Sequence, residues 1–298
     1  MKILITGGTV FVSKFVAQHF AKAGNEVYVL NRNTRPQLSD VKLIECDRNN
    51  IGNTLKGHHF DVVIDVTAYT AEDINCLLDG LESFDSYVMI SSSAVYPETL
   101  AQPFKESDNC GPNKFWGSYG TNKVAAERAL TTRVPDAYII RPPYLYGEYN
   151  NVYREAFVFD CAEKSASFYL PGDGSIPLQF FYVEDLCIFI ERVIELQPIQ
   201  KIFNVGNEPV STREWVELCY AAAGKTPNFI SVDKNIEQRN YFPFYNYSYR
   251  LDTSLQSAIM PDLMPLDVGL LRAYNWYKEN NAEVKAKPYF EYIERNLA

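Results

Sequence analysis

A tyrosine and a lysine four residues apart are the side chains best suited to acid–base chemistry in this sequence. Tyr119 and Lys123 lie in Gly117–Arg133, an alanine-rich segment that predicts a helix, so the two side chains share one helical face. A phenol loses its proton near pH ~10, so its use near neutral pH requires the pKa to fall by roughly 3, or ~4 kcal/mol. A neighbouring ammonium group favours the phenolate. The pair therefore predicts proton exchange with a substrate hydroxyl.

A run of serines supplies hydroxyl groups that would align the same substrate oxygen. The run Ser91–Ser93 lies at the carboxyl end of a predicted strand, which is where a parallel sheet binds its ligands. A second Tyr-x-x-x-Lys pair, Tyr274 and Lys278, has no serine strand before it. Because the chain has 21 tyrosines, about one such pair arises by chance. We therefore interpret the second pair as a solvated helix face.

The first dozen residues have the pattern of a strand, a glycine turn and a helix start. Lys2–Thr6 is a short apolar run, Gly7 and Gly8 interrupt it, and aromatic residues then recur near helical spacing. This order opens a dinucleotide-binding unit, because the free N–H groups and the positive dipole end of a helix start suit a pyrophosphate. Val10 and Ser13 stand where the motif T-G-x-x-G-x-x-G has its other glycines. A tight turn after any buried strand is an equally good interpretation of these residues alone.

Strands and helices alternate through the first half of the chain, which predicts an α/β fold with a doubly wound parallel sheet. The later part predicts one more strand–helix unit and a smaller mixed C-terminal substrate lobe. We expect residues 1–148 and 178–206 to form the dinucleotide-binding domain, and residues 149–177 and 207–298 to form the lobe. The predicted strands are Lys2–Thr6, Glu26–Leu30, Val41–Cys46, Asp61–Val66, Ser86–Ser91, Ala137–Arg141, Leu178–Val183 and Lys201–Val205. The predicted helices include Ala71–Phe84, Gly117–Arg133, Val183–Leu196, Pro265–Asn280 and Pro288–Leu297.

Composition limits the classes of function. The 298 residues include 28 Lys and Arg against 37 Asp and Glu, a net charge of −9, which argues against a nucleic-acid partner because phosphate contacts need clustered cations. Six cysteines are scattered without a C-x-x-C pair and only three histidines are present, so we expect reduced thiols and no metal site. No stretch approaches the ~20 apolar residues of a membrane span. We expect a cytoplasmic protein that makes no membrane contact.

The order and spacing of several motifs resemble the extended short-chain dehydrogenases/reductases of the NAD-dependent epimerase/dehydratase family. The motifs are TGGTVFVS (6–13), CD (46–47), ISSSAVYP (90–97), SYGTNKVAAE (118–127), IIRPPYLYG (139–147), LQFFYVEDL (178–186), FNVGN (203–207) and PLDVGLLRAYNWY (265–277). The resemblance covers nearly the whole chain. It implies a Rossmann fold, an NAD or NADP cofactor and a small-molecule substrate, typically a nucleotide-sugar. It also implies a homodimer that pairs the helices at 71–84 and 117–133.

The resemblance assigns roles to matching residues. Tyr119 resembles the catalytic acid–base, Lys123 the lysine that holds the nicotinamide ribose, and Ser92 the catalytic hydroxyl, with Ser93 as the alternative. Asp47 resembles the aspartate that hydrogen-bonds the adenine, and Arg141 is expected to serve the structure. The candidate cofactor-binding residues are Gly7, Thr9, Val10, Phe11, Val12, Asn31, Arg32, Asp47, Thr67, Ala68, Tyr119, Lys123, Pro142 and Tyr144. The candidate substrate-binding residues are Ser93, Arg154, Gln179 and Arg250.

Departures from the family pattern bear on the cofactor and the reaction. The G-G-T-x-F-x glycine loop resembles a subgroup that includes plant-type stem-loop RNA-binding proteins as well as bacterial members. Asn31 and Arg32 replace the acidic residue that NAD-preferring proteins carry after the second strand, which favours NADP slightly. Ser93 and Ala94 replace the Asp-Glu pair of nucleotide-sugar 4,6-dehydratases, which disfavours dehydration.

Two functions follow from these patterns. The first is an NAD(P)-dependent epimerase or oxidoreductase that acts on a sugar carbinol, and the intact set of Ser92, Tyr119 and Lys123 favours it. The second is a catalytically silent RNA-binding or regulatory protein on the same fold, which the altered glycine loop favours.

Overall fold

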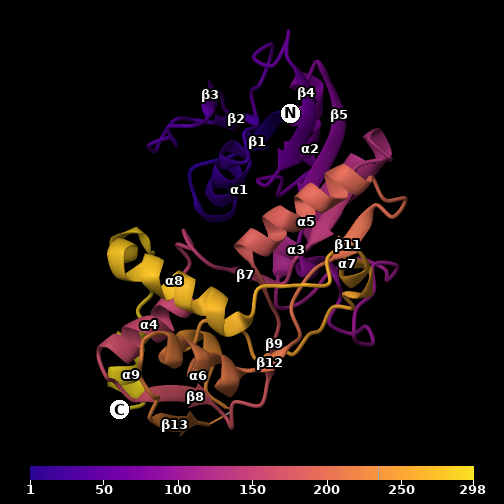
Figure 1. Ribbon diagram of the computed structural model, residues 1–298. Helices are drawn as coiled ribbons and strands as arrows, with labels where there is room; N and C mark the ends of the chain where they lie inside the picture. Colours follow the sequence, from indigo (N-terminus) through magenta and orange to yellow (C-terminus); the bar gives the residue numbers. More distant parts are fainter. Residues whose placement is uncertain (234) are drawn as a thin grey trace.

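A seven-stranded parallel sheet organises the computed structural model, which describes residues 1–233 and 235–298 (Figure 1). The strands run in the order β11-β6-β5-β4-β1-β2-β3, and β1 pairs in parallel with both β2 and β4. This order confirms the doubly wound fold. It places the ligand crevice at the carboxyl ends of β1 and β4, where the strand order reverses. The strands are β1 (Lys2–Thr6), β2 (Glu26–Asn31), β3 (Lys42–Glu45), β4 (His59–Asp65), β5 (Ser83–Ile90), β6 (Tyr138–Arg141) and β11 (Ile202–Asn204).

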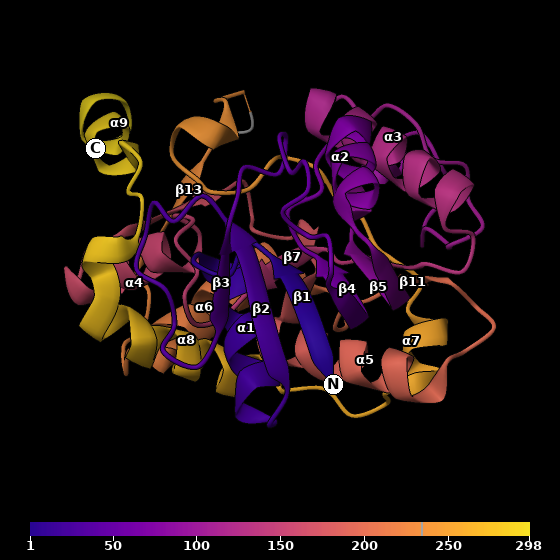
Figure 2. The same ribbon diagram turned by 90° about the horizontal axis from the view of Figure 1, so that it is seen from above.

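Helices cover both faces of this sheet (Figure 2). Helices α1 and α5 pack together on one face, and α2 and α3 pack together on the other. Successive strand residues point to opposite faces, so Ile3 and Ile5 join the apolar core beneath α1 and α5, whereas Leu4 joins the core beneath α2 and α3. Burial on both faces explains the apolar runs 3–5, 62–64 and 88–90 in the central strands. The four helices are α1 (Phe11–Lys22), α2 (Ala71–Gly80), α3 (Gly117–Arg133) and α5 (Val183–Leu196).

The second lobe has a core of aromatic side chains and lies below the sheet in Figure 1. Phe180 stacks on Trp215, and Phe244 packs edge-on against both rings. Within residues 207–298, α7 instead packs against α5 and β11. None of the helices in the described ranges is both long and apolar enough to cross a membrane. The remaining elements are β7 (Tyr144–Tyr146), α4 (Glu155–Glu163), β8 (Phe168–Pro171), β9 (Pro177–Leu178), β10 (Phe180–Tyr182), β12 (Val210–Ser211), α6 (Thr212–Ala222), β13 (Phe229–Val232), α7 (Ser254–Ile259), α8 (Leu266–Asn280) and α9 (Tyr289–Asn296), with short 3-10 turns at Ser93–Val95, Gln238–Asn240 and Asn281–Glu283.

Two predicted elements end differently from the observed ones. The helix expected over 71–84 ends at Gly80, because Leu81 takes up extended backbone and Ser83 already begins β5. The strand expected over 178–183 divides at Gln179 into β9 and β10. These differences leave the order of the elements unchanged.

The second Tyr-x-x-x-Lys pair does not lie on a solvated face. Tyr274 is buried, with its ring packed in the second lobe. Its hydroxyl donates a hydrogen bond to Glu163. The prediction was wrong because helix α8 packs against α4 and α6, contacts that a local pattern does not reveal.

Candidate active site

A cleft runs along the carboxyl edge of the sheet and consists of two adjoining pockets that share Thr67 and Tyr69. The lining of the first includes Gly7, Asn31, Arg32, Asp47, Arg48 and Asp73. The lining of the second includes Val10, Phe11, Val12, Ser91, Tyr119 and Lys123. Four of the candidate cofactor residues, Thr9, Ala68, Pro142 and Tyr144, do not line either pocket. The cleft therefore has Asp47 at one end and the acid–base pair at the other.

The glycine turn closes onto α1 without the usual third glycine. Gly7 and Gly8 both have φ of +94°, a conformation that favours glycine. A Cβ on Gly7 would lie 2.7 Å from Ser13 Oγ, and this hydroxyl donates to Val10 O at 3.0 Å. Asn31 Nδ2 donates to Gly7 O at 2.7 Å and so fixes the turn to the end of β2. These features fit a dinucleotide, because the bare main chain at Gly7 borders the cleft and a helix start leaves N–H groups free.

Lys123 is 2% exposed and faces the ends of β4 and β5 from helix α3. Its Nζ donates to Ala68 O at 2.7 Å and to Ile90 O at 2.9 Å, and lies 5.0 Å from the centroid of the Tyr69 ring. Burial lowers the pKa of Lys123 to about 8, although nearby carboxylates act in the opposite direction. The ammonium group therefore joins α3 to the carboxyl edge of the sheet.

Tyr119 lies one helical turn before Lys123 and borders the same pocket. Its side chain is 40% exposed, but its hydroxyl end is enclosed, and this desolvation raises the pKa of Tyr119. Interaction with the Ser92 hydroxyl and the positive charge of Arg154 both lower that pKa. The pKa of Tyr119 is raised overall because desolvation outweighs both of these contributions. The lowering expected from Lys123 is not seen; its ammonium group donates to the main-chain carbonyls of Ala68 and Ile90.

A buried ion pair lies behind the acid–base pair. Glu127, one turn beyond Lys123, accepts hydrogen bonds from Arg141 Nε at 3.0 Å and Nη2 at 2.6 Å. Ser91 Oγ also donates to Glu127, and Arg141 Nη1 donates to Tyr96 Oη at 2.7 Å. The pair ties α3 to β6 and to the serine run. Arg141 therefore serves the structure, as expected.

Other candidates divide between the cleft and the second lobe. Ser93 is buried, its N–H donates to Pro142 O at 2.9 Å, and its hydroxyl interacts with Tyr249. Ser92 is thus the serine brought to Tyr119. The guanidinium of Arg154 lies 4.9 Å from the centroid of the Tyr144 ring, which packs in the aromatic core of the second lobe.

Gln179 and Arg250 do not line the cleft. Gln179 is 1% exposed, and its amide donates to Asn207 O at 2.9 Å and accepts from Leu251 N at 2.8 Å. Its side chain is therefore occupied in joining main-chain segments. Arg250 is exposed, and its main chain pairs with Phe104 and with the Gln102 side chain. We leave both residues out of the site.

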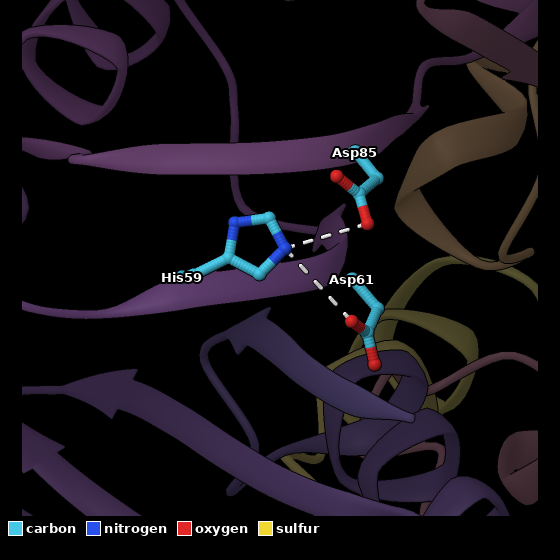
Figure 3. Close-up of side chains that lie close together, drawn as sticks. All are labelled: His59, Asp61 and Asp85. Atoms are coloured by element: carbon cyan, nitrogen blue, oxygen red, sulfur yellow. Dashed lines mark ion pairs between the residues drawn. The ribbon is translucent and has the colours of Figure 1, made fainter.

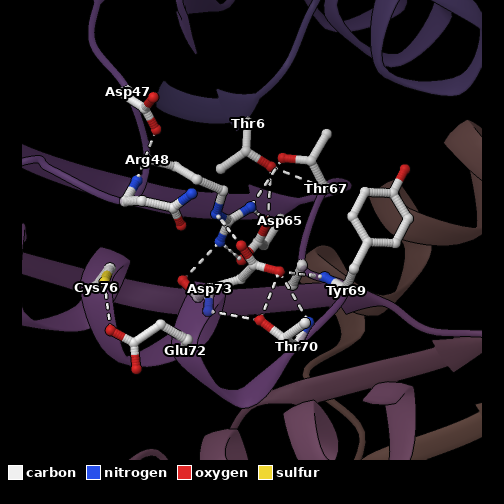
Figure 4. A network of polar contacts seen from close by, with 12 residues as sticks. Thr6, Asp47, Arg48, Asp65, Thr67, Tyr69, Thr70, Glu72, Asp73 and Cys76 are labelled. Atoms are coloured by element: carbon white, nitrogen blue, oxygen red, sulfur yellow. Dashed lines mark hydrogen bonds and ion pairs between the residues drawn. The ribbon is translucent and has the colours of Figure 1, made fainter. Parts of the chain in front are cut away.

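The cleft residues that sequence reasoning missed include Arg48 and Tyr69 (Figure 4). Tyr69 lies where the two pockets meet, and Arg48 forms two 3.0 Å hydrogen bonds to the Asp65 carboxylate. A signal was present in the sequence, because an aspartate inside an apolar strand requires a partner when it is buried. The sequence does not say which cation would supply it.

A separate group of metal-ligating side chains lies at the amino ends of β4 and β5 (Figure 3). His59 Nε2 is 3.4 Å from Asp85 Oδ2 and 4.0 Å from Asp61 Oδ1, and all three side chains are accessible to solvent. Asp61 also accepts the main-chain N–H of Lys2 at 2.6 Å. These contacts are surface ion pairs at the edge of the sheet opposite the cleft.

A doubly wound sheet with a glycine turn after β1, and with Tyr119 and Lys123 at its carboxyl edge, defines a dinucleotide-binding protein of the short-chain dehydrogenase/reductase type. Residues 3–206 match the NAD dependent epimerase/dehydratase family, and the chain belongs to that family.

Comparison with known proteins finds both a stem-loop binding protein and a reductase of a dTDP-sugar. The chain is 27% identical to the chloroplast stem-loop binding protein of 41 kDa b of Arabidopsis thaliana, over 92% of this chain and 78% of that protein. It is 24% identical to a dTDP-4-dehydro-6-deoxy-D-allose reductase of Streptomyces sp, over 93% of this chain and 96% of that protein.

Solved structures show the same fold at low sequence identity. A dTDP-glucose 4,6-dehydratase from Bacillus anthracis in complex with NAD matches with a TM-score of 0.75 at 18% identity, covering 95% of this chain and 98% of that one. A UDP-glucuronic acid 4-epimerase from Bacillus cereus in complex with UDP-glucuronic acid and NAD matches with a TM-score of 0.73 at 19% identity, covering 94% and 99%.

Proposed function

We propose that the protein is an NAD(P)-dependent epimerase or reductase that acts on a sugar carbon of a nucleotide-sugar. The observation that carries this proposal is the cleft itself. Tyr119, Lys123 and Ser92 lie at one end of the cleft, where a bound dinucleotide would place its nicotinamide. Asp47 lies at the other end, where the adenine would bind. Family membership and the named enzymes among the relatives support it.

The residues would divide the chemistry as follows. A bound nicotinamide supplies a hydride acceptor or donor and, when oxidised, a positive charge. Tyr119 takes the proton of the sugar hydroxyl during oxidation and returns it to the carbonyl oxygen during reduction, while Ser92 aligns that oxygen. The pKa of Tyr119 is raised in the present structure. A neighbouring positive charge is therefore what this phenol needs in order to act near neutral pH.

A group of cations supports an anionic substrate. Arg154 lowers the pKa of Tyr119. Desolvation, and then the charges of Arg239 and Arg154, lower the pKa of Lys287, so the three positive charges lie near one another. Among the described residues none of the three has a carboxylate within ion-pair distance. Uncompensated cations beside a catalytic tyrosine, in a chain of net charge −9, suit the phosphates of a nucleotide-sugar.

The choice of dinucleotide and the oligomeric state belong to the same proposal. Arg32 is exposed at the end of β2 and supports a slight preference for NADP, although Glu45, the register partner of Asn31, would repel a 2′-phosphate.

Helices α2 and α3 lie side by side on one face of the sheet and are the surface we assign to a homodimer.

The second candidate function is RNA binding on the same fold. The stem-loop binding relative and the replaced glycines favour it. The negative net charge disfavours it, because counterion release at phosphates drives such binding.

One titration separates the two functions. We expect NADH or NADPH to bind at micromolar concentration with a change in nicotinamide fluorescence, and a stem-loop RNA to bind weakly and only at low salt. Absence of dinucleotide binding together with salt-dependent RNA binding would reverse the assignment. Turnover of a nucleotide-sugar that stops in Tyr119→Phe would identify the enzyme.

A further inference from the structure

Nearly all N–H groups of the Arg48 guanidinium contact acceptors in a buried polar network that borders the cleft (Figure 4). Its Nη1 and Nη2 each donate to Asp65 at 3.0 Å, Nη1 also donates to Thr67 Oγ1 at 2.8 Å, and Nη2 donates to Asp73 O at 2.8 Å. Its Nε lies 3.4 Å from Asp73 Oδ1. Arg48 is 12% exposed and Asp65 is fully buried, so solvent screens this ion pair little.

The Asp65 carboxylate gathers further strands into the same network. Thr6 Oγ1 and Tyr87 Oη each donate to it at 2.7 Å. Thr6 is the last residue of β1, directly before the glycine turn, and its hydroxyl accepts the N–H groups of Val66 and Thr67 at 3.0 and 3.1 Å. Arg48 therefore joins the loop after β3 to the ends of β1 and β4, to β5 and to the start of α2.

The segment that this network holds, residues 66–70, serves both pockets of the cleft. Thr67 and Tyr69 line the first and the second pocket alike. Asp73 accepts the N–H groups of Tyr69 and Thr70 at 2.9 and 2.8 Å, which fixes the end of the segment. Within it, Ala68 O accepts the ammonium of Lys123.

We propose that Arg48 is a positioning residue: by holding the segment 66–70 through Asp65 and Asp73, it sets the place of Lys123 as well as the floor of the first pocket. Arg48 acts through these groups and does not touch the reacting atoms. The use of a dinucleotide as the probe rests on the proposed function, whereas the placement of the segment does not.

The same network sets the charge around Lys123. The titratable and charged groups around it are Tyr119 and Glu127 on α3, Asp65 on β4, Tyr69 just before α2, Asp73 on α2 and Arg48 itself. The carboxylates raise the pKa of Lys123, and Arg48 lowers it. Removing the positive charge of Arg48 should therefore raise this pKa, and removing the negative charge of Asp65 should lower it. If Arg48 and Asp65 only stabilised the fold, removing their charges would not shift the pKa of Lys123 in opposite directions.

The test compares Arg48→Met, Arg48→Lys and Asp65→Asn with wild type. Arg133→Met is the control, because it removes an exposed ion pair of Arg133 with Asp79 at the far end of α3. The first readout is hydrogen exchange of the peptide containing residues 66–70 in the cofactor-free protein. We expect faster exchange in Arg48→Met, partial protection in Arg48→Lys, which keeps the charge, and the wild-type rate in Arg133→Met.

The second readout is NADH affinity between pH 7 and 10. We expect about tenfold weaker binding in Arg48→Met. Because the protonated Lys123 is the form that donates to a ribose, affinity should fall as pH rises, with a midpoint that moves up in Arg48→Met and down in Asp65→Asn. Unchanged exchange of residues 66–70 in Arg48→Met, or midpoints that move in the same direction, would overturn the inference. Failure of wild type to bind NADH counts against the proposed function, and exchange alone then decides the role of Arg48.

Discussion

The ammonium group of Lys123 is buried away from water, and only main-chain carbonyls and an aromatic ring contact it and stabilise its charge. Its Nζ has two main-chain acceptors and the face of Tyr69. Burial lowers the pKa to about 8, from 10.5 for the free side chain. A group held in this way is disfavoured in the folded state while it is charged, and it can turn to new partners when a ligand offers hydroxyl groups.

The lowered pKa of Lys123 makes a prediction about stability. Between pH 8 and 10.5 the unfolded chain holds the proton and the folded protein does not, so the free energy of unfolding rises with pH in this window. We expect wild type to gain about 2 kcal/mol relative to Lys123→Met between pH 7 and 9.5, measured by urea unfolding. A difference that stays constant across these pH values would contradict the burial of a charged Lys123.

At the scale of elements, α3 is fixed to the sheet by the Glu127–Arg141 pair as well as by apolar packing. Arg141 comes from β6, and the side chains of both partners are less than 10% exposed. The serine run is joined to the same carboxylate through Ser91. Helix α3 therefore holds Tyr119 and Lys123 in a fixed relation to Ser92.

Breaking the Glu127–Arg141 ion pair should lower the free energy of unfolding strongly. We expect Glu127→Gln to lower the free energy of unfolding by roughly 3–5 kcal/mol, because it leaves the Arg141 guanidinium buried without a counter-charge. Arg133→Ala on the same helix removes an exposed pair and should cost less than about 1 kcal/mol. If urea unfolding shows similar decreases in the free energy of unfolding for Glu127→Gln and Arg133→Ala, the buried pair stabilises the protein no more than the exposed pair does.

The elements themselves could be predicted well from the sequence, and their ends less well. The alternation of strand and helix patterns predicts the doubly wound order, because the central strands are buried on both faces and each helix on one. The end of α2 was placed too late because the apolar spacing continues through Leu81, where the backbone is already extended. The Arg48–Asp65 pair could not be predicted, since it joins β4 to a loop that only the folded sheet brings near.

At the scale of the whole molecule, Tyr119, the proposed acid–base group, lies between two lobes of different character. The first lobe supplies Tyr119, Lys123 and the dinucleotide cleft, and the second supplies aromatic side chains and cations such as Arg154. The sequence predicts a division into two lobes, but not which polar residues of the second lobe face Tyr119. Gln179 is a candidate by its position in or near the second lobe, but its side chain is hydrogen-bonded to main-chain partners.

The second lobe makes its own prediction. We expect Arg154→Ala to raise KM for a nucleotide-sugar at least about tenfold and to leave NADH affinity unchanged, since its charge would meet the substrate phosphates. Arg213→Ala is the matched control, because Arg213 also lies over a ring, that of Phe229, but is not among the charges that act on Tyr119. Equal kinetics for the two variants would remove Arg154 from the substrate site.

The most direct measurement of the central claim is nicotinamide reduction within a single turnover, recorded by absorbance with the enzyme in excess over the nucleotide-sugar. A single turnover is needed because an epimerase returns the hydride to the sugar and leaves no net reduction of the cofactor. We expect wild type and Tyr274→Phe to reduce NAD or NADP with at least one UDP- or dTDP-sugar, and Tyr119→Phe to be slower by roughly 10²–10⁴-fold with unchanged dinucleotide affinity. Tyr274 is the matched control because it begins the chain's second Tyr-x-x-x-Lys sequence and lies in the second lobe. Equal rates in Tyr119→Phe and wild type would contradict the assignment of Tyr119 as the acid–base group.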